Sequence, residues 1–87
     1  MNLDGAREKI DEMDAKIVEL LAKRFELCKK IGEYKKKNNL SIQDKDREKQ
    51  IIKARAEKLK KLGFEEEKFV QELFELIMKK CREVQKK

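Results

Sequence analysis

The chain has 87 residues, enough for one small domain, and a net charge of +6, which favours an anionic partner. Charged residues make up 48% of it, with three glycines and no proline, a composition typical of long helices and poor in sheet-forming residues. No apolar run is long enough to span a membrane, and the N-terminus lacks the apolar stretch of a signal peptide, so we expect a cytoplasmic protein with no membrane contact.

The first predicted helix covers about residues 4–38. At 1.5 Å per residue, about 35 residues make a rod of about 50 Å, whereas a compact domain of this length has a radius of gyration of about 12 Å. Two shorter helices cannot cover such a rod, so we expect a homodimer with the two long helices packed together. Its apolar residues recur at steps of three and four, at Ile10, Met13, Ile17, Leu20, Leu21, Leu27, Cys28 and Ile31.

Two shorter helices are expected at about residues 44–62 and 65–86. The segment NNLSIQD breaks the apolar pattern and indicates a loop, after which Ser41 or Asp44 can cap the second helix. Gly63 suits the end of that helix, and the acidic residues that follow suit the positive end of the third. The sequence therefore predicts a single all-α domain of three helices over residues 1–87.

The two cysteines, Cys28 and Cys81, lie far apart in the sequence, each among apolar residues at helical spacing. Because a free cysteine behaves as a small hydrophobic residue, we interpret both as buried thiols rather than as a disulfide or a nucleophile. The chain has no histidine and no CxxC pair, so we expect no metal site and no cofactor. The commonest general base is absent for the same reason.

Each predicted helix carries polar residues within its apolar face when residues are placed about 100° apart. On the first helix, Arg24 and Lys35 fall inside the apolar arc and Arg7 falls at its edge. On the second helix Glu48 falls inside the arc, and on the third Gln85 falls at its centre. The apolar face of every helix therefore includes at least one group that can bind a polar ligand.

Each of these residues taken alone has a simple structural explanation. A long Arg or Lys can extend its charge into water, Glu48 suits the first turn of a helix, and Gln85 can belong to a frayed end. Together they are harder to dismiss, because an unpaired buried charge costs several kcal/mol and such groups converge on partners or a ligand. The excess of cations favours a small molecule with more than one carboxylate, which arginine binds bidentately.

Four segments in order resemble the all-helical, AroQ-type chorismate mutase family: REKIDEMDAKIVELLAKR, KKIGEYK, DKDREK and LFELIMKKCREVQ. They extend over nearly the whole chain. The resemblance implies an intertwined homodimer with two equivalent active sites. It also implies an isomerase that converts chorismate to prephenate by a Claisen rearrangement, in the shikimate pathway of aromatic amino acid biosynthesis. A fusion to, or association with, another shikimate-pathway enzyme stays open.

The resemblance also implies roles for individual residues. Arg24 would bind one substrate carboxylate, and the partner subunit's Arg7 would bind the other. Lys35 and Gln85 would donate to the ether oxygen from opposite sides, and Glu48 would accept from the ring hydroxyl. Three further positions would contact substrate: the backbone at Asp44, the side chain of Arg47, and Cys81, where many relatives carry a hydroxyl and a thiol is a poorer donor.

Two other functions stay open at this stage. An isochorismate pyruvate-lyase-like enzyme of the same fold would use a similar pocket, but we expect it to lack the Asp-x-x-Arg-Glu segment found here at residues 44–48. A non-catalytic basic helical module that binds nucleic acid fits less well, because the lysines are spread over all faces and no stacking motif is present. A purely structural coiled coil would not need these polar residues in its apolar stripe.

Overall fold

The computed structural model describes residues 1–86 as three α-helices, α1 (Leu3–Lys37), α2 (Lys45–Lys61) and α3 (Glu67–Gln85). The described residues contain no strand, which confirms the all-α prediction. The helix ends differ from the predicted ones by one or two residues, and residue 87 of the predicted domain lies outside the described part. None of the described helices combines the length and apolar character that crossing a bilayer requires.

Local hydrogen bonds explain where α2 begins and ends. The Asp44 carboxylate accepts from the backbone N–H of Arg47 at 3.1 Å and caps the helix, as a residue at this position is expected to do. Ser41 does not cap it, because its hydroxyl donates to the Gln43 carbonyl at 3.1 Å. After the last turn the backbone reverses at Gly63, whose φ of 105° lies in the region that glycine adopts without strain.

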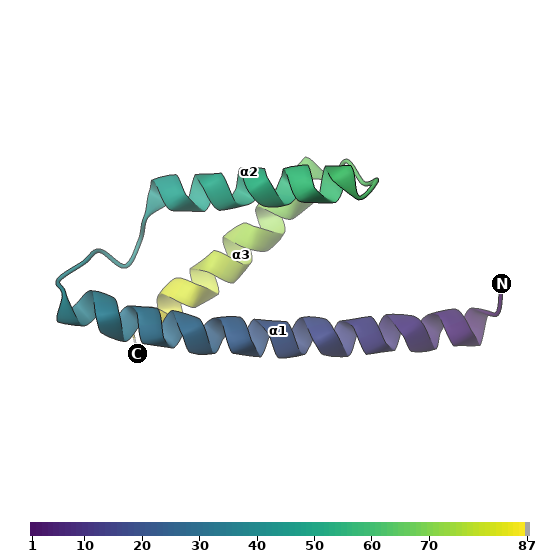
Figure 1. The fold of residues 1–87 in the computed structure, drawn as a ribbon, viewed down its shortest axis with the longest axis horizontal. Helices are drawn as coiled ribbons and strands as arrows, with labels where there is room; N and C mark the ends of the chain where they lie inside the picture. The colour runs from purple at the N-terminus through teal and green to yellow at the C-terminus, as the bar shows by residue number, and fades with distance from the viewer. Residues whose placement is uncertain (87) are drawn as a thin grey trace.

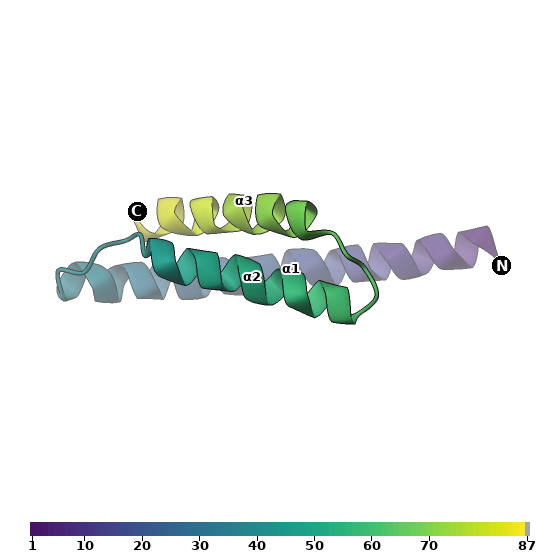
Figure 2. The same cartoon turned by 90° about the horizontal axis from the view of Figure 1, so that it is seen from above.

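Helix α3 holds the fold together, because it packs against both of the other helices (Figures 1 and 2). Within residues 1–86, α1 and α2 have no Cα atoms within 8 Å of each other. The N-terminal part of α1 extends beyond both shorter helices, as both views show. The radius of gyration is 16.0 Å, against about 12 Å for a compact domain of this length. The single chain is therefore an open, elongated arrangement.

Few side chains are buried in this arrangement: Cys28, Ile51, Val70 and Met78. The apolar stripe predicted on the first helix lies largely on the surface of the chain. Six of its members are between 45% and 63% exposed: Ile10, Met13, Ile17, Leu20, Leu27 and Ile31. An exposed apolar surface of this extent is typical of an interaction site, and the homodimer stays a prediction at this point.

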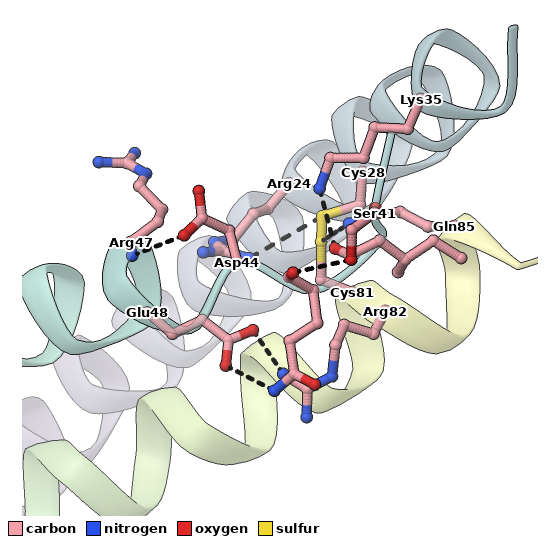
Figure 3. A network of polar contacts seen from close by, with 12 residues as sticks. Arg24, Cys28, Lys35, Ser41, Asp44, Arg47, Glu48, Cys81, Arg82 and Gln85 are labelled. Carbon is pink, nitrogen blue, oxygen red and sulfur yellow. Dashed lines mark hydrogen bonds and ion pairs between the residues drawn. A yellow bond between two sulfur atoms is a disulfide. The ribbon is translucent and has the colours of Figure 1, made fainter. Parts of the chain in front are cut away.

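Helices α1 and α3 are joined by a disulfide between Cys28 and Cys81, whose Cα atoms are 5.5 Å apart (Figure 3). The interpretation of these residues as buried thiols was wrong. Helical periodicity correctly places each cysteine on the inward face of its own helix, but it contains no information about which residues of two helices meet. The crossing of α1 and α3 brings the two sulfur atoms together. Cys81 therefore has no S–H with which to donate to a substrate.

Candidate active site

An open cavity of about 270 Å³ lies among α1, the start of α2 and the end of α3, close to the lower limit of typical ligand sites. Its apolar lining includes Leu27, Ile31 and Met78. Six of the eight residues predicted to form a site also line it: Arg24, Asp44, Arg47, Glu48, Cys81 and Gln85. Figure 3 shows that these side chains come from all three helices, so the cavity exists only once the chain has folded.

Arg24 provides a half-buried positive charge at this cavity. Burial lowers the pKa of its guanidinium, and the positive charges of Arg55 and Arg47 lower it further. Its Nη1 atom lies 3.9 Å from the Cys28 sulfur, a weak acceptor. Among residues 1–86, no carboxylate lies within 4.0 Å of this guanidinium. A carboxylate from a ligand would therefore offset both the cost of burying the positive charge and its repulsion from the two neighbouring arginines.

Glu48 points inward, as the helical placement predicted, and its side chain is 21% exposed. Its Oε2 atom accepts a hydrogen bond from Arg82 Nη1 at 2.6 Å, and its Oε1 atom accepts a longer one from Gln43 Nε2 at 3.4 Å. The sequence analysis missed Arg82. A signal was present, because Arg82 lies about 80° from Phe74, at the edge of the apolar face of α3.

The resemblance assigned two donors to the ether oxygen, the neutral amide of Gln85 and the positively charged ammonium group of Lys35. Gln85 Nε2 donates to the Cys81 sulfur at 3.2 Å, and its Oε1 atom is buried without a hydrogen-bond partner among the described residues. Lys35 Nζ donates to the Ile42 carbonyl at 2.8 Å. Lys35 lines an adjoining depression that shares Asp44 with the cavity. Both donors thus contact uncharged acceptors, and each could exchange its acceptor for a negatively charged oxygen, which forms a stronger hydrogen bond.

Among residues 1–86 of one chain, the side chains of two predicted site residues, Arg47 and Arg7, take no part in the polar contacts at the cavity. The Arg47 side chain is exposed, and its guanidinium points away from the polar network drawn in Figure 3. Arg7 is exposed near the N-terminal end of α1, about 25 Å from Arg24 at 1.5 Å per residue. One chain therefore does not bring Arg7 to the cavity. A site that includes this residue needs a second copy of the chain.

The residues at the cavity are suited to binding and orienting an anion. They combine cations, an amide donor and one inward carboxylate, and the sequence has no histidine to activate a nucleophile. Within residues 1–86, no three His, Cys, Asp or Glu side chains are grouped so that they could hold a metal ion. The chemistry available to these side chains is hydrogen bonding and electrostatic stabilisation.

The described residues form a small all-helical protein whose cavity is lined by three arginines and two acidic residues. The family model described as chorismate mutase type II matches residues 6–86, and the chain belongs to this family. The chain is 36% identical to the chorismate mutase of Methanocaldococcus jannaschii over 80 residues, which cover 92% of this chain and 80% of that protein. It is 38% identical over 81 residues to a bifunctional chorismate mutase/prephenate dehydratase of Buchnera aphidicola.

Several relatives are much longer than this chain. The match to the Buchnera protein covers 93% of this chain but 21% of that protein. A Pyrobaculum aerophilum protein named 3-dehydroquinate dehydratase is 35% identical over 83 residues, covering 95% of this chain and 24% of that protein. The chain thus spans about a fifth to a quarter of the length of these curated relatives.

Proposed function

We propose that the chain converts chorismate to prephenate, an isomerisation on the route to phenylalanine and tyrosine. The observation that carries the proposal is Arg24, a half-buried cation at the cavity with no carboxylate within 4.0 Å among residues 1–86. Chorismate is a dianion, and a bidentate Arg–carboxylate pair would neutralise this charge. Family membership over residues 6–86 supports the same reaction.

The rearrangement needs the flexible substrate to be held in its folded, reactive conformer, since the bond that forms and the bond that breaks belong to one molecule. Arg24 would anchor one carboxylate, while Glu48 would accept a hydrogen bond from the ring hydroxyl. The apolar side chains of Ile31 and Met78 line the same cavity and would contact the ring. Fixing the substrate at these positions removes conformational freedom that otherwise opposes the reaction.

Negative charge develops on the ether oxygen as its C–O bond breaks, and Gln85 and Lys35 would stabilise it. Gln85 Nε2 contacts a sulfur and Lys35 Nζ contacts a neutral carbonyl, so both would gain more from a charged oxygen than they lose. This interaction strengthens towards the transition state, which is the requirement for raising kcat. No proton needs to move and no covalent intermediate forms.

The proposal includes a homodimer in which the partner subunit's Arg7 completes each site. Support comes from the exposed apolar residues of α1 and from the distance of about 25 Å between Arg7 and Arg24 within one chain. Packing α1 of a second copy against this stripe would cover it. It would also carry a second arginine towards the cavity, where the other substrate carboxylate needs a cation.

We further propose that the reaction takes place in the cytoplasm and that the chain acts beside or fused to another enzyme of the same route. The second part is supported by two relatives from Buchnera aphidicola that are named bifunctional chorismate mutase/prephenate dehydratase. A substrate made by a preceding enzyme and consumed by a following one would then pass over a short distance. Copurification with such an enzyme, or a gene that joins the two, would support this proposal.

The test is to add chorismate to purified protein and to follow the loss of chorismate absorbance and the appearance of prephenate by mass spectrometry. Gln85→Ala is the matched variant, expected to stay folded and to lose roughly 10²-fold in kcat. Isochorismate is offered in parallel, and release of pyruvate from it would favour the lyase instead. A folded protein that leaves chorismate at its uncatalysed rate contradicts the proposed function.

A further inference from the structure

The shortest hydrogen bond between side chains of the described residues joins Arg82 on α3 to Glu48 on α2. Arg82 Nη1 donates to Glu48 Oε2 at 2.6 Å, and the two side chains are 26% and 21% exposed. The other two ion pairs of residues 1–86, Lys60–Glu65 and Lys80–Glu83, are at least 48% exposed and join near neighbours in the sequence. Only the Arg82–Glu48 pair is shielded from solvent and lines the cavity.

We propose that Arg82 is a positioning residue for substrate recognition, which holds the Glu48 carboxylate towards the ring hydroxyl and balances its charge. The inference rests on the proposed function and adds a residue that the sequence analysis did not include. In Figure 3 the Glu48 carboxylate on α2 and the Arg82 guanidinium on α3 point toward each other. A carboxylate has about four lone-pair sites, so Glu48 can accept from Arg82 and from a hydroxyl together.

Charge balance is the first reason for this role. Arg82 is the only cation of residues 1–86 that lies within 4.0 Å of the Glu48 carboxylate, so without Arg82 this carboxylate would be unpaired. A dianion entering such a site would meet an unpaired Glu48, and like charges at close range repel strongly where solvent screening is weak. With Arg82 present, the lining of the cavity has an excess of positive charge. Glu48 can then contribute a hydrogen bond without rejecting the substrate.

Geometry is the second reason. Glu48 is held at both oxygens, by Arg82 at 2.6 Å and by Gln43 at 3.4 Å. The Gln43 contact is long and exposed, so Arg82 supplies most of the restraint. A carboxylate that keeps one orientation before substrate arrives does not lose rotational freedom on binding. Loss of Arg82 would therefore weaken recognition of the hydroxyl more than the chemical step.

The experiment compares Arg82→Met, which keeps an unbranched apolar side chain in place of the arginine stem but removes the charged guanidinium, with Arg82→Lys and with the wild type. We expect Arg82→Met to raise KM for chorismate roughly tenfold, the loss expected for a hydrogen bond to a charged group, with kcat within about threefold. Arg82→Lys should recover most of the affinity. Lys60→Met, which breaks an exposed ion pair away from the cavity, is the matched control and should change neither constant.

A substrate comparison separates positioning from a merely structural role. With an analogue whose ring hydroxyl is methylated, Arg82→Met should raise KM less than it does with chorismate. Glu48 then has no hydroxyl proton to accept, and only its repulsion of the dianion remains. Adding Arg82→Met to Glu48→Gln should cause no further rise in KM for chorismate, because the carboxylate is already gone. If Arg82→Met fails to fold, Arg82→Gln replaces it in both comparisons.

An equal loss for both substrates, or an unchanged KM for chorismate in a folded Arg82→Met or Arg82→Gln enzyme, overturns the positioning role. So does a further rise in KM when the substitution is added to Glu48→Gln. These results leave the proposed function intact as long as the wild type consumes chorismate. A wild type that does not consume it refutes the function itself, so the two failures are distinguishable.

Discussion

At the residue scale, Arg24 illustrates a conflict between stability and binding. Burial and then the positive charges of Arg55 and Arg47 lower the pKa of its guanidinium. A cation with a lowered pKa in the folded state is held less favourably there than in the unfolded chain. The guanidinium is protonated in both states at all pH values well below its pKa, so this unfavourable contribution is constant across the neutral range.

We therefore expect Arg24→Met, without ligand, to unfold at a temperature equal to or above that of the wild type. A stable bicyclic dicarboxylate that mimics the rearranging substrate should stabilise the wild type by about 2.7 kcal/mol at 100 times its dissociation constant, but should not stabilise Arg24→Met. Thermal unfolding followed by circular dichroism measures both effects. Lys23→Met, which removes an exposed neighbouring charge, should respond to the ligand like the wild type.

If Arg24→Met were both less stable and fully able to bind the dicarboxylate, Arg24 would be a structural residue. The prediction of this residue from sequence rested on its place in the apolar arc of the first helix. The same argument placed Glu48 inward correctly. It could not identify Arg82 as its partner, because that contact depends on how α2 and α3 pack.

At the element scale, α1 and α3 approach each other closely at Gly32. A Cβ atom at this position would lie 2.6 Å from the Cα and carbonyl oxygen of Gln85 and 2.9 Å from its Cβ. The neighbouring atoms are mostly backbone, which cannot rotate away. The glycine that weakens the first helix locally is therefore needed for the crossing of the two helices beside the cavity.

Gly32→Ala should destabilise the protein by about 1–3 kcal/mol, the usual cost of overpacking, although alanine favours a helix by about 1 kcal/mol. It should also lower kcat, because α3 must shift at Gln85. Denaturant unfolding and the chorismate assay measure the two effects. Gly5→Ala is the matched control, since its nearest neighbours are side-chain atoms of Asn2 at 3.7–3.8 Å, and it should be neutral or slightly stabilising.

The disulfide between Cys28 and Cys81 is the second link between α1 and α3. Its cysteines are 53 residues apart, and in the chain-entropy account closing a loop of about this size stabilises the folded state by about 4 kcal/mol. Reduction should lower the free energy of unfolding by up to that amount. The measurement is denaturant unfolding with and without reductant at one protein concentration.

A double variant, Cys28→Ser with Cys81→Ser, should not respond to the reductant. Two thiols that react with an alkylating agent in the purified, unreduced protein would contradict the disulfide. Alkylation in freshly lysed cells shows whether the disulfide is also formed inside the cell. Disulfides are rare in the cytoplasm except in hyperthermophiles, so a disulfide found in the cells of another kind of organism would count against the proposed location.

At the scale of the whole molecule, the shape of the chain suggests that it is half of an assembly. The N-terminal part of α1 extends beyond α2 and α3 in both views, and its apolar residues are exposed (Figures 1 and 2). Within residues 1–86 of one chain, this part of α1 has no packing partner and is held mainly by its own backbone hydrogen bonds. A second copy would supply the missing surface and the second arginine of each site.

Mixing Arg7→Ala with Arg24→Ala subunits, followed by unfolding and refolding, should restore roughly a quarter of the wild-type activity. Random pairing makes half of the dimers mixed, and each mixed dimer has one intact site. Activity is measured with chorismate, and native mass spectrometry verifies the mixed dimers. Verified mixed dimers without recovered activity would mean that Arg7 does not serve the site of its partner.

The sequence by itself determined the three helices, the turn at Gly63 and the inward position of Glu48, and it limited the cap of α2 to Ser41 or Asp44. These features depend on the 3.6-residue period and on hydrogen bonds between near neighbours, which the order of residues specifies. Only the tertiary structure decided the disulfide, the Arg82–Glu48 pair and the close approach at Gly32. Each depends on the angle and register at which two helices cross, because residues far apart in sequence meet only there.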